Sequence, residues 1–195
     1  MRAYTEYWVA MLLRGFFAVL AATAILFLTG VAATVLLLPL AIVSTILCLA
    51  AYGMVDSAIV IASSFMIPRN RPGRLVLRVQ GVCGLIFGAL MFSVIYDHVT
   101  VAWFLYLAAA QATAVAIAEF GVARGTADHH RSKWCYMSSV IAAVSAIVLI
   151  SLGGLEHKQI VWVIYSYLGV FGLNLIALSA WMLFEQRRQI AASDA

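Results

Sequence analysis

The chain has 195 residues, of which 65% are hydrophobic and only 10% are charged, and its mean hydropathy is +1.04. This composition excludes an ordinary soluble domain and is typical of an integral membrane protein. The 12 Lys and Arg residues outnumber the 8 Asp and Glu residues. Because the basic residues lie at the ends of apolar runs, we expect them to set membrane topology and not to bind nucleic acid.

Turns and charges divide the chain into six apolar segments, each near the roughly 20 residues that a transmembrane helix needs. The first segment is expected to be retained as a span, because no small-residue cleavage site interrupts it. Gly30 indicates a turn before the second segment, and Pro39 falls in the opening turn of that helix. The sequence predicts an all-α membrane protein with one transmembrane domain and spans at 8–28, 38–66, 75–96, 101–123, 134–152 and 160–184.

The basic residues lie almost entirely on one side of this arrangement. They occur near the amino end, around the second and fourth breaks and in the tail at 186–195, and only Lys158 is left for the opposite side. Cytoplasmic segments of membrane proteins are enriched in Lys and Arg. We therefore expect both termini to be cytoplasmic, which an even number of spans also requires.

Scarce polar residues recur at similar depths in three predicted hairpins, 8–66, 75–123 and 134–184. Matches of small or aliphatic residues are common by chance between apolar helices, so the polar matches carry more weight. They favour a repeated two-helix unit. The matching residues are Arg14, Gln80 and Ser138 in the odd-numbered helices, and Asp56, Gln111 and Asn174 in the even-numbered ones.

Several of these features together resemble a known family. They are the Arg14-Gly15 step in the first helix, Pro39 at the start of the second, and Tyr52 and Asp56 in "YGMVDSA". With three tandem hairpins, the pattern is similar to the HdeD-like acid-resistance membrane proteins of bacteria over roughly residues 8 to 185. The resemblance implies an inner-membrane protein associated with acid or stress tolerance.

Asp56 lies in the otherwise apolar stretch "CLAAYGMVDSAIVIASS". A charged aspartate near the bilayer centre costs about 2.5–3.5 kcal/mol, so it should face other protein, a proton or a cation. Arg14 and Asp56 should lie at similar depth in the first two helices, and we predict a salt bridge between them. Because an arginine would hold the acid ionised, a structural clasp is favoured over a titrating site in a proton or solute path.

The repeat extends this contact into a polar layer. Gln80 with Gln111, and Ser138 or Ser139 with Asn174, would be neutral versions of the same contact. Each hydrogen bond between helices would contribute about 0.6–2 kcal/mol. The face of the second helix that carries the layer should point inward; it consists of Tyr52, Asp56, Val60 and Ser63.

Two histidines in the predicted outer loops stand beside acids, as Asp97-His98 and Glu156-His157. A histidine titrates near pH 6.5, so the pair could sense external acidification. The alternative is ordinary solvated loop polarity.

Gly81, Gly84 and Gly88 form a face of small residues that lets another helix approach closely. The alanine-rich fourth helix is the expected mate, and whether the glycines meet the same chain or a second copy stays open. Glu119, near the end of that fourth helix, is expected to have a solvated structural role, reaching the interface or pairing with Arg124.

No catalytic triad, phosphate-binding glycine loop or metal motif occurs in the sequence, so we expect neither an enzyme nor a cofactor. Cys48, Cys83 and Cys135 have unrelated spacings, and "DHHRSK" at 128–133 lacks further ligands for a metal.

The favoured hypothesis is a non-enzymatic HdeD-like protein that acts through structure or partner binding. The alternatives are a proton or weak-acid channel or transporter using Asp56 and Arg14, and an accessory subunit of a larger complex. The expected partners are the lipid bilayer and either a second copy or other membrane proteins.

Overall fold

The structure is a computed structural model that describes residues 7–34, 38–66, 72–96, 101–125, 129–151 and 157–193, all of which are helical. Each helix contains an apolar stretch of 19 to 25 residues, long enough to cross a membrane. The prediction of an all-α membrane protein with six spanning helices is confirmed. The helices are α1 (Tyr7–Thr34), α2 (Leu38–Met66), α3 (Pro72–Tyr96), α4 (Val101–Gly125), α5 (His129–Ser151) and α6 (His157–Ser193).

Two helices continue beyond their expected ends. α1 runs through Gly30 to Thr34, so the turn predicted at Gly30 is wrong. One glycine costs a helix only about 1 kcal/mol, and no proline or charge stops α1 there. α6 continues through "EQRRQIAAS" to Ser193, so the expected tail at 186–195 is largely helical. Glu, Gln, Arg and Ala are good helix formers, which accounts for this extension.

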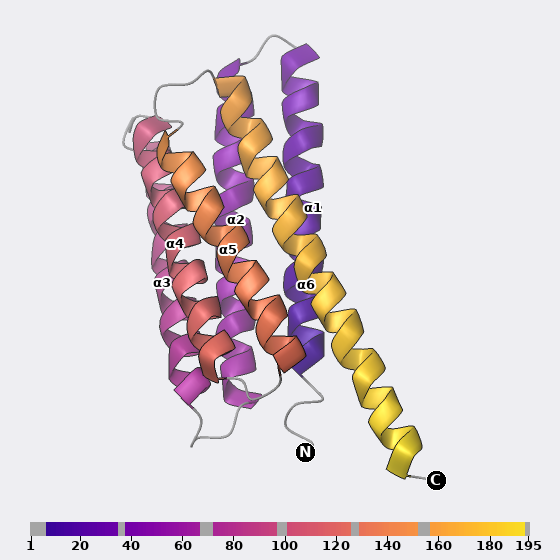
Figure 1. The fold of residues 1–195 in the computed structure, drawn as a ribbon. Helices are drawn as coiled ribbons and strands as arrows, with labels where there is room; N and C mark the ends of the chain where they lie inside the picture. Colours follow the sequence, from indigo (N-terminus) through magenta and orange to yellow (C-terminus); the bar gives the residue numbers. More distant parts are fainter. Residues whose placement is uncertain are drawn as a thin grey trace.

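The helices form a ring in chain order, which α6 closes by packing against α1. Figure 1 shows α1 and α6 side by side, although they lie at opposite ends of the sequence. The most extensive interfaces are α1–α6, α2–α3 and α4–α5, and those of α1–α2, α3–α4 and α5–α6 are smaller. Each predicted hairpin therefore packs more closely against its neighbours in the ring than within itself.

The outside of the ring is as apolar as its core. Large apolar side chains such as Phe27, Leu75 and Ile117 are 70%, 69% and 68% exposed. These side chains suit a lipid environment, which gives apolar residues no reason to turn inward. The inward faces of the helices are instead marked by small residues, by polar residues and by closely packed apolar ones.

Glycines set two of the closest helix contacts. A Cβ atom added to Gly15 on α1 would lie 2.7 Å from the carbonyl oxygen of Gly172 on α6, and one added to Gly172 would lie 2.8 Å from that of Gly15. On α3, a Cβ on Gly88 would lie 2.7 Å from Met54 Cγ and 3.3 Å from the carbonyl oxygen of Ala50.

The glycine face of α3 therefore packs against α2, and the expectation that α4 is its mate is wrong. Gly81 and Gly84 make the same kind of contact, because an added Cβ would collide with Ile61 and Ser57, respectively. Ser57, a small residue of α2, allows this approach, whereas a Cβ added to Gly53 would meet the Gln111 amide of α4 instead. The face is filled within the chain, so it is not a free surface for a second copy.

Candidate functional site

Three charged side chains meet inside the ring. Arg14 of α1 donates from Nε to Asp56 Oδ1 of α2 at 2.7 Å and from Nη2 to Oδ2 at 3.4 Å. Its Nη1 donates to Glu119 Oε1 of α4 at 3.1 Å. Arg14, Glu119 and Asp56 are only 1%, 2% and 5% exposed. One guanidinium thus joins three helices through two carboxylates, and we call Arg14, Asp56 and Glu119 the ion cluster.

The depth of each residue in its helix explains why the cluster forms. At 1.5 Å per residue, Arg14 lies about 10 Å from the start of α1, Glu119 about 9 Å from the end of α4, and Asp56 about 15 Å from the end of α2. The long arginine side chain covers the remaining difference. The predicted contact between Arg14 and Asp56 is present.

Glu119 was expected to be solvated, and that expectation is wrong. The residue faces the interior of the ring, where the guanidinium of Arg14 is its partner. Arg124, the alternative partner, is exposed and stacks on the Phe120 ring, with its Cζ 4.7 Å from the ring centroid. A comparison of depths across α1 and α4 would have pointed to Glu119.

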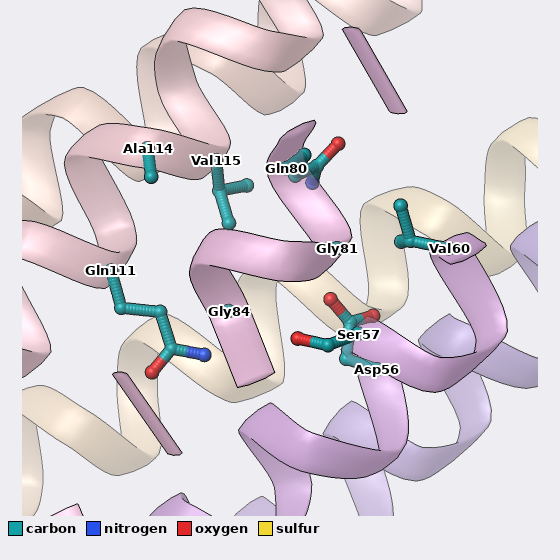
Figure 2. A pocket seen from close by; sticks show the side chains of 9 residues that line it. All are labelled: Asp56, Ser57, Val60, Gln80, Gly81, Gly84, Gln111, Ala114 and Val115. Atoms are coloured by element: carbon teal, nitrogen blue, oxygen red, sulfur yellow. The ribbon is translucent and has the colours of Figure 1, made fainter. Parts of the chain in front are cut away.

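The expected hydrogen bond between Gln80 and Gln111 is not formed. Both side-chain amide atoms of Gln80, Nε2 and Oε1, are buried and lack a hydrogen-bond partner within the described part of the chain. Gln80 lies about 12 Å from the start of α3, whereas Gln111 lies about 21 Å from the end of α4. This mismatch in depth separates the two amides, although both line one pocket (Figure 2).

The neutral contact predicted for the third hairpin is present. Asn174 Nδ2 of α6 donates to Ser138 Oγ of α5. Ser139 turns the other way and donates to the carbonyl oxygen of Ala116 on α4 at 2.8 Å. These bonds connect α4, α5 and α6. Of these three helices, the ion cluster includes only α4, through Glu119.

The inward face predicted for α2 is confirmed, because Tyr52, Asp56, Val60 and Ser63 are all buried. Two small pockets adjoin this face. The first lies against α3 and α4, and the second extends from Tyr52 to Tyr167 of α6. Each has space for about one water molecule.

His98 lies outside the described residues, and His157 starts α6 with a side chain that is also outside them. Cys48, Cys83 and Cys135 are free thiols. Among the residues described, no three His, Cys, Asp or Glu side chains gather in a way that could hold a metal ion.

Comparison with known proteins found no match: no protein-family model, curated protein or solved structure matches the chain.

Proposed function

We propose that the chain is a non-catalytic membrane protein of the HdeD-like type that supports acid or envelope-stress tolerance in the inner membrane of a bacterium. It acts through its structure or through a bound partner. The observation that carries the proposal is the ion cluster, in which Arg14 contacts Asp56 and Glu119 with all three residues buried. The resemblance of the sequence pattern supplies the link to acid tolerance.

A clasp is the role that these contacts support best. Charged groups inside a membrane are costly and are usually paired and functional. Here the forked guanidinium of Arg14 holds the carboxylates of two other helices, in a geometry that lysine cannot reproduce. The adjoining pockets have space for about one water molecule each. This favours a structural role over the passage of a larger solute.

The test is the survival of bacterial cells that produce the protein. Cells with the wild-type chain should survive an acid challenge better than cells with an empty vector. Arg14→Met should lose this gain, because two buried carboxylates then lose their shared cation. Leu13→Met is the matched control, since Leu13 is the exposed neighbour of Arg14 and receives the same residue.

Membrane levels of all variants are compared by immunoblot. If the wild-type chain gives no gain in survival, the acid-tolerance role is wrong. If Arg14→Met keeps the full gain at equal membrane levels, the ion cluster has no part in that role.

A proton path through Asp56 is the second candidate. Asp56, Gln111 and Val115 line both pockets, so the carboxylate adjoins two water-sized spaces. Such spaces suit a proton carried by water better than they suit a weak acid.

Proteoliposomes with an internal pH dye test this candidate. Asp56→Asn should abolish proton flux, whereas Glu119→Gln, the same chemical change at an acid that lines neither pocket, should retain it. Equal flux in empty liposomes and in liposomes with the wild-type protein would eliminate the proton path.

A further inference from the structure

The first pocket lies between α2, α3 and α4 and contains unusually polar groups for a membrane interior. Figure 2 shows Asp56 and Ser57 on α2, Gln80 beside the pocket on α3, and Gln111 on α4. Gly81 and Gly84 also line the pocket, and as glycines they place no side chain in it. The pocket therefore brings a carboxylate, a hydroxyl and two amides to one small space.

Gln80 is the strongest sign that this space binds something. The residue is 6% exposed, and neither its Nε2 nor its Oε1 has a hydrogen-bond partner among the residues that the structure describes. A buried amide without partners is costly, and such groups in proteins are usually satisfied by a bound water or ion. The side chain lines the pocket that also contains Asp56.

Size and bonding capacity select the ligand. The pocket has space for about one water molecule. A metal cation would satisfy the oxygen of Gln80 but would leave its N–H groups without an acceptor. A water molecule, in contrast, can accept a hydrogen bond from Nε2 and donate one to a carboxylate. It therefore suits both the hydrogen-bond donors and the acceptors of the pocket.

Ser57 offers a further acceptor to such a ligand. Its hydroxyl donates to the carbonyl oxygen of Gly53 at 2.6 Å, so its own oxygen can still accept a hydrogen bond. Asp56 also retains acceptor capacity, because a carboxylate has about four lone-pair sites and Arg14 uses only two of them. Buried waters typically make about three hydrogen bonds, and the pocket supplies that number.

We propose that this pocket binds one internal water molecule, which links the Gln80 amide to the Asp56 carboxylate. The site makes Asp56 the hydrated acid of the ion cluster, while Glu119 lies outside both pockets. The water site is independent of the acid-tolerance role. Its use in proton transfer would rest on the second candidate function.

The experiment uses the full chain in lipid nanodiscs with ¹⁵N-labelled glutamine. Solid-state NMR measures magnetisation transfer from water to each side-chain amide, and Gln80→Leu identifies the signal of Gln80. We expect strong transfer to Gln80 in the wild-type protein. Val115→Ile adds a methylene group to the pocket lining and should reduce that transfer at least severalfold.

Val122→Ile is the matched control, because it makes the same change on a buried valine of α4 that lines neither pocket. It should leave the Gln80 signal as in the wild-type protein. No water transfer to Gln80 in the wild-type protein would overturn the proposal. Equal transfer in Val115→Ile and Val122→Ile would also overturn it, as would a shift of the Gln80 signal on titration with sodium chloride, which would identify a cation as the occupant. Loss of acid tolerance or of proton flux does not enter this readout.

Discussion

Arg14 is the only residue of the ion cluster known to contact both of the others. Its guanidinium lies 2.7 Å from Asp56 and 3.1 Å from Glu119. Removal of one acid leaves a paired arginine. Removal of the arginine takes the shared cation from two buried carboxylates, so the three residues should differ in their effect on stability.

Arg14→Met should therefore be the most destabilising single change in the ion cluster. The loss of one partner from a buried ion pair costs about 3–5 kcal/mol, and here two acids lose the same partner. Arg14→Lys should fall between Met and the wild type, because an ammonium group cannot reproduce the fork that reaches both acids. Thermal unfolding in detergent provides the measurement, with Leu13→Met as the control. An Arg14→Met midpoint equal to that of the control would show that the cluster does not stabilise the fold.

Glu119→Gln should be milder than Asp56→Asn. Arg14 donates to Glu119 Oε1 at 3.1 Å, whereas it donates to both carboxylate oxygens of Asp56, at 2.7 and 3.4 Å. A hydrogen bond to a charged group contributes about 1.5–3 kcal/mol, so Glu119→Gln should cost roughly that amount and Asp56→Asn more. Both variants are compared in the same unfolding assay. The reverse order would mean that Glu119, and not Asp56, is the principal partner of Arg14.

At the scale of helices, small residues decide which faces meet. Apolar side chains cover the lipid-facing surface and the core alike, so hydrophobic pattern alone does not orient a helix in this ring. Gly15 and Gly172 instead bring the backbones of α1 and α6 together, because a Cβ atom added to either glycine would lie only 2.7 or 2.8 Å from the carbonyl oxygen of the other. Backbone atoms cannot move aside as a flexible side chain can.

Gly172→Ala should therefore destabilise the protein, whereas Gly169→Ala should not. A Cβ at position 172 would lie 2.8 Å from the Gly15 carbonyl oxygen and 2.9 Å from the Ala18 Cβ, but one at 169 meets nothing within 4 Å. Overpacking of this kind costs about 1–3 kcal/mol, while alanine in an open helix position gains up to about 1 kcal/mol over glycine. Unfolding midpoints of the two variants, one turn apart on α6, test the difference. Equal effects would contradict the close contact of α1 with α6.

The sequence could predict contacts between consecutive helices better than contacts that depend on how the ring packs. Arg14 with Asp56 and Ser138 with Asn174 follow from similar depths in consecutive helices, and both contacts are present. The depth of Glu119 also matches that of Arg14, but α1 and α4 are not consecutive, so the sequence did not show that the ring would bring these two helices together. The glycines of α3 correctly marked a close approach but carried no information on whether α2 or α4 would fill it.

At the scale of the whole molecule, ring closure explains how a chain of short hairpins gains a common interior. α6 packs against α1 as extensively as α2 packs against α3 and α4 against α5. The three larger interfaces therefore lie between hairpins, and no hairpin is an independent unit. The ion cluster and the Ser138–Asn174 bond lie inside this ring and draw on five of its helices.

The two ends of the chain must lie on the same side of the membrane, because α1 begins and α6 ends on the same side of the bundle (Figure 1). Among the residues that the structure describes, Arg74 and Arg78 near the start of α3 and Arg124 near the end of α4 lie at this same end of the bundle. Since basic residues are retained in the cytoplasm, fusions of green fluorescent protein at either terminus should fluoresce, and alkaline phosphatase fused there should be inactive. Alkaline phosphatase inserted between α5 and α6 should be active. The opposite pattern would place Arg14, Asp56 and Glu119 nearer the outer surface, where the cluster would meet external acid directly instead of through the depth of the membrane.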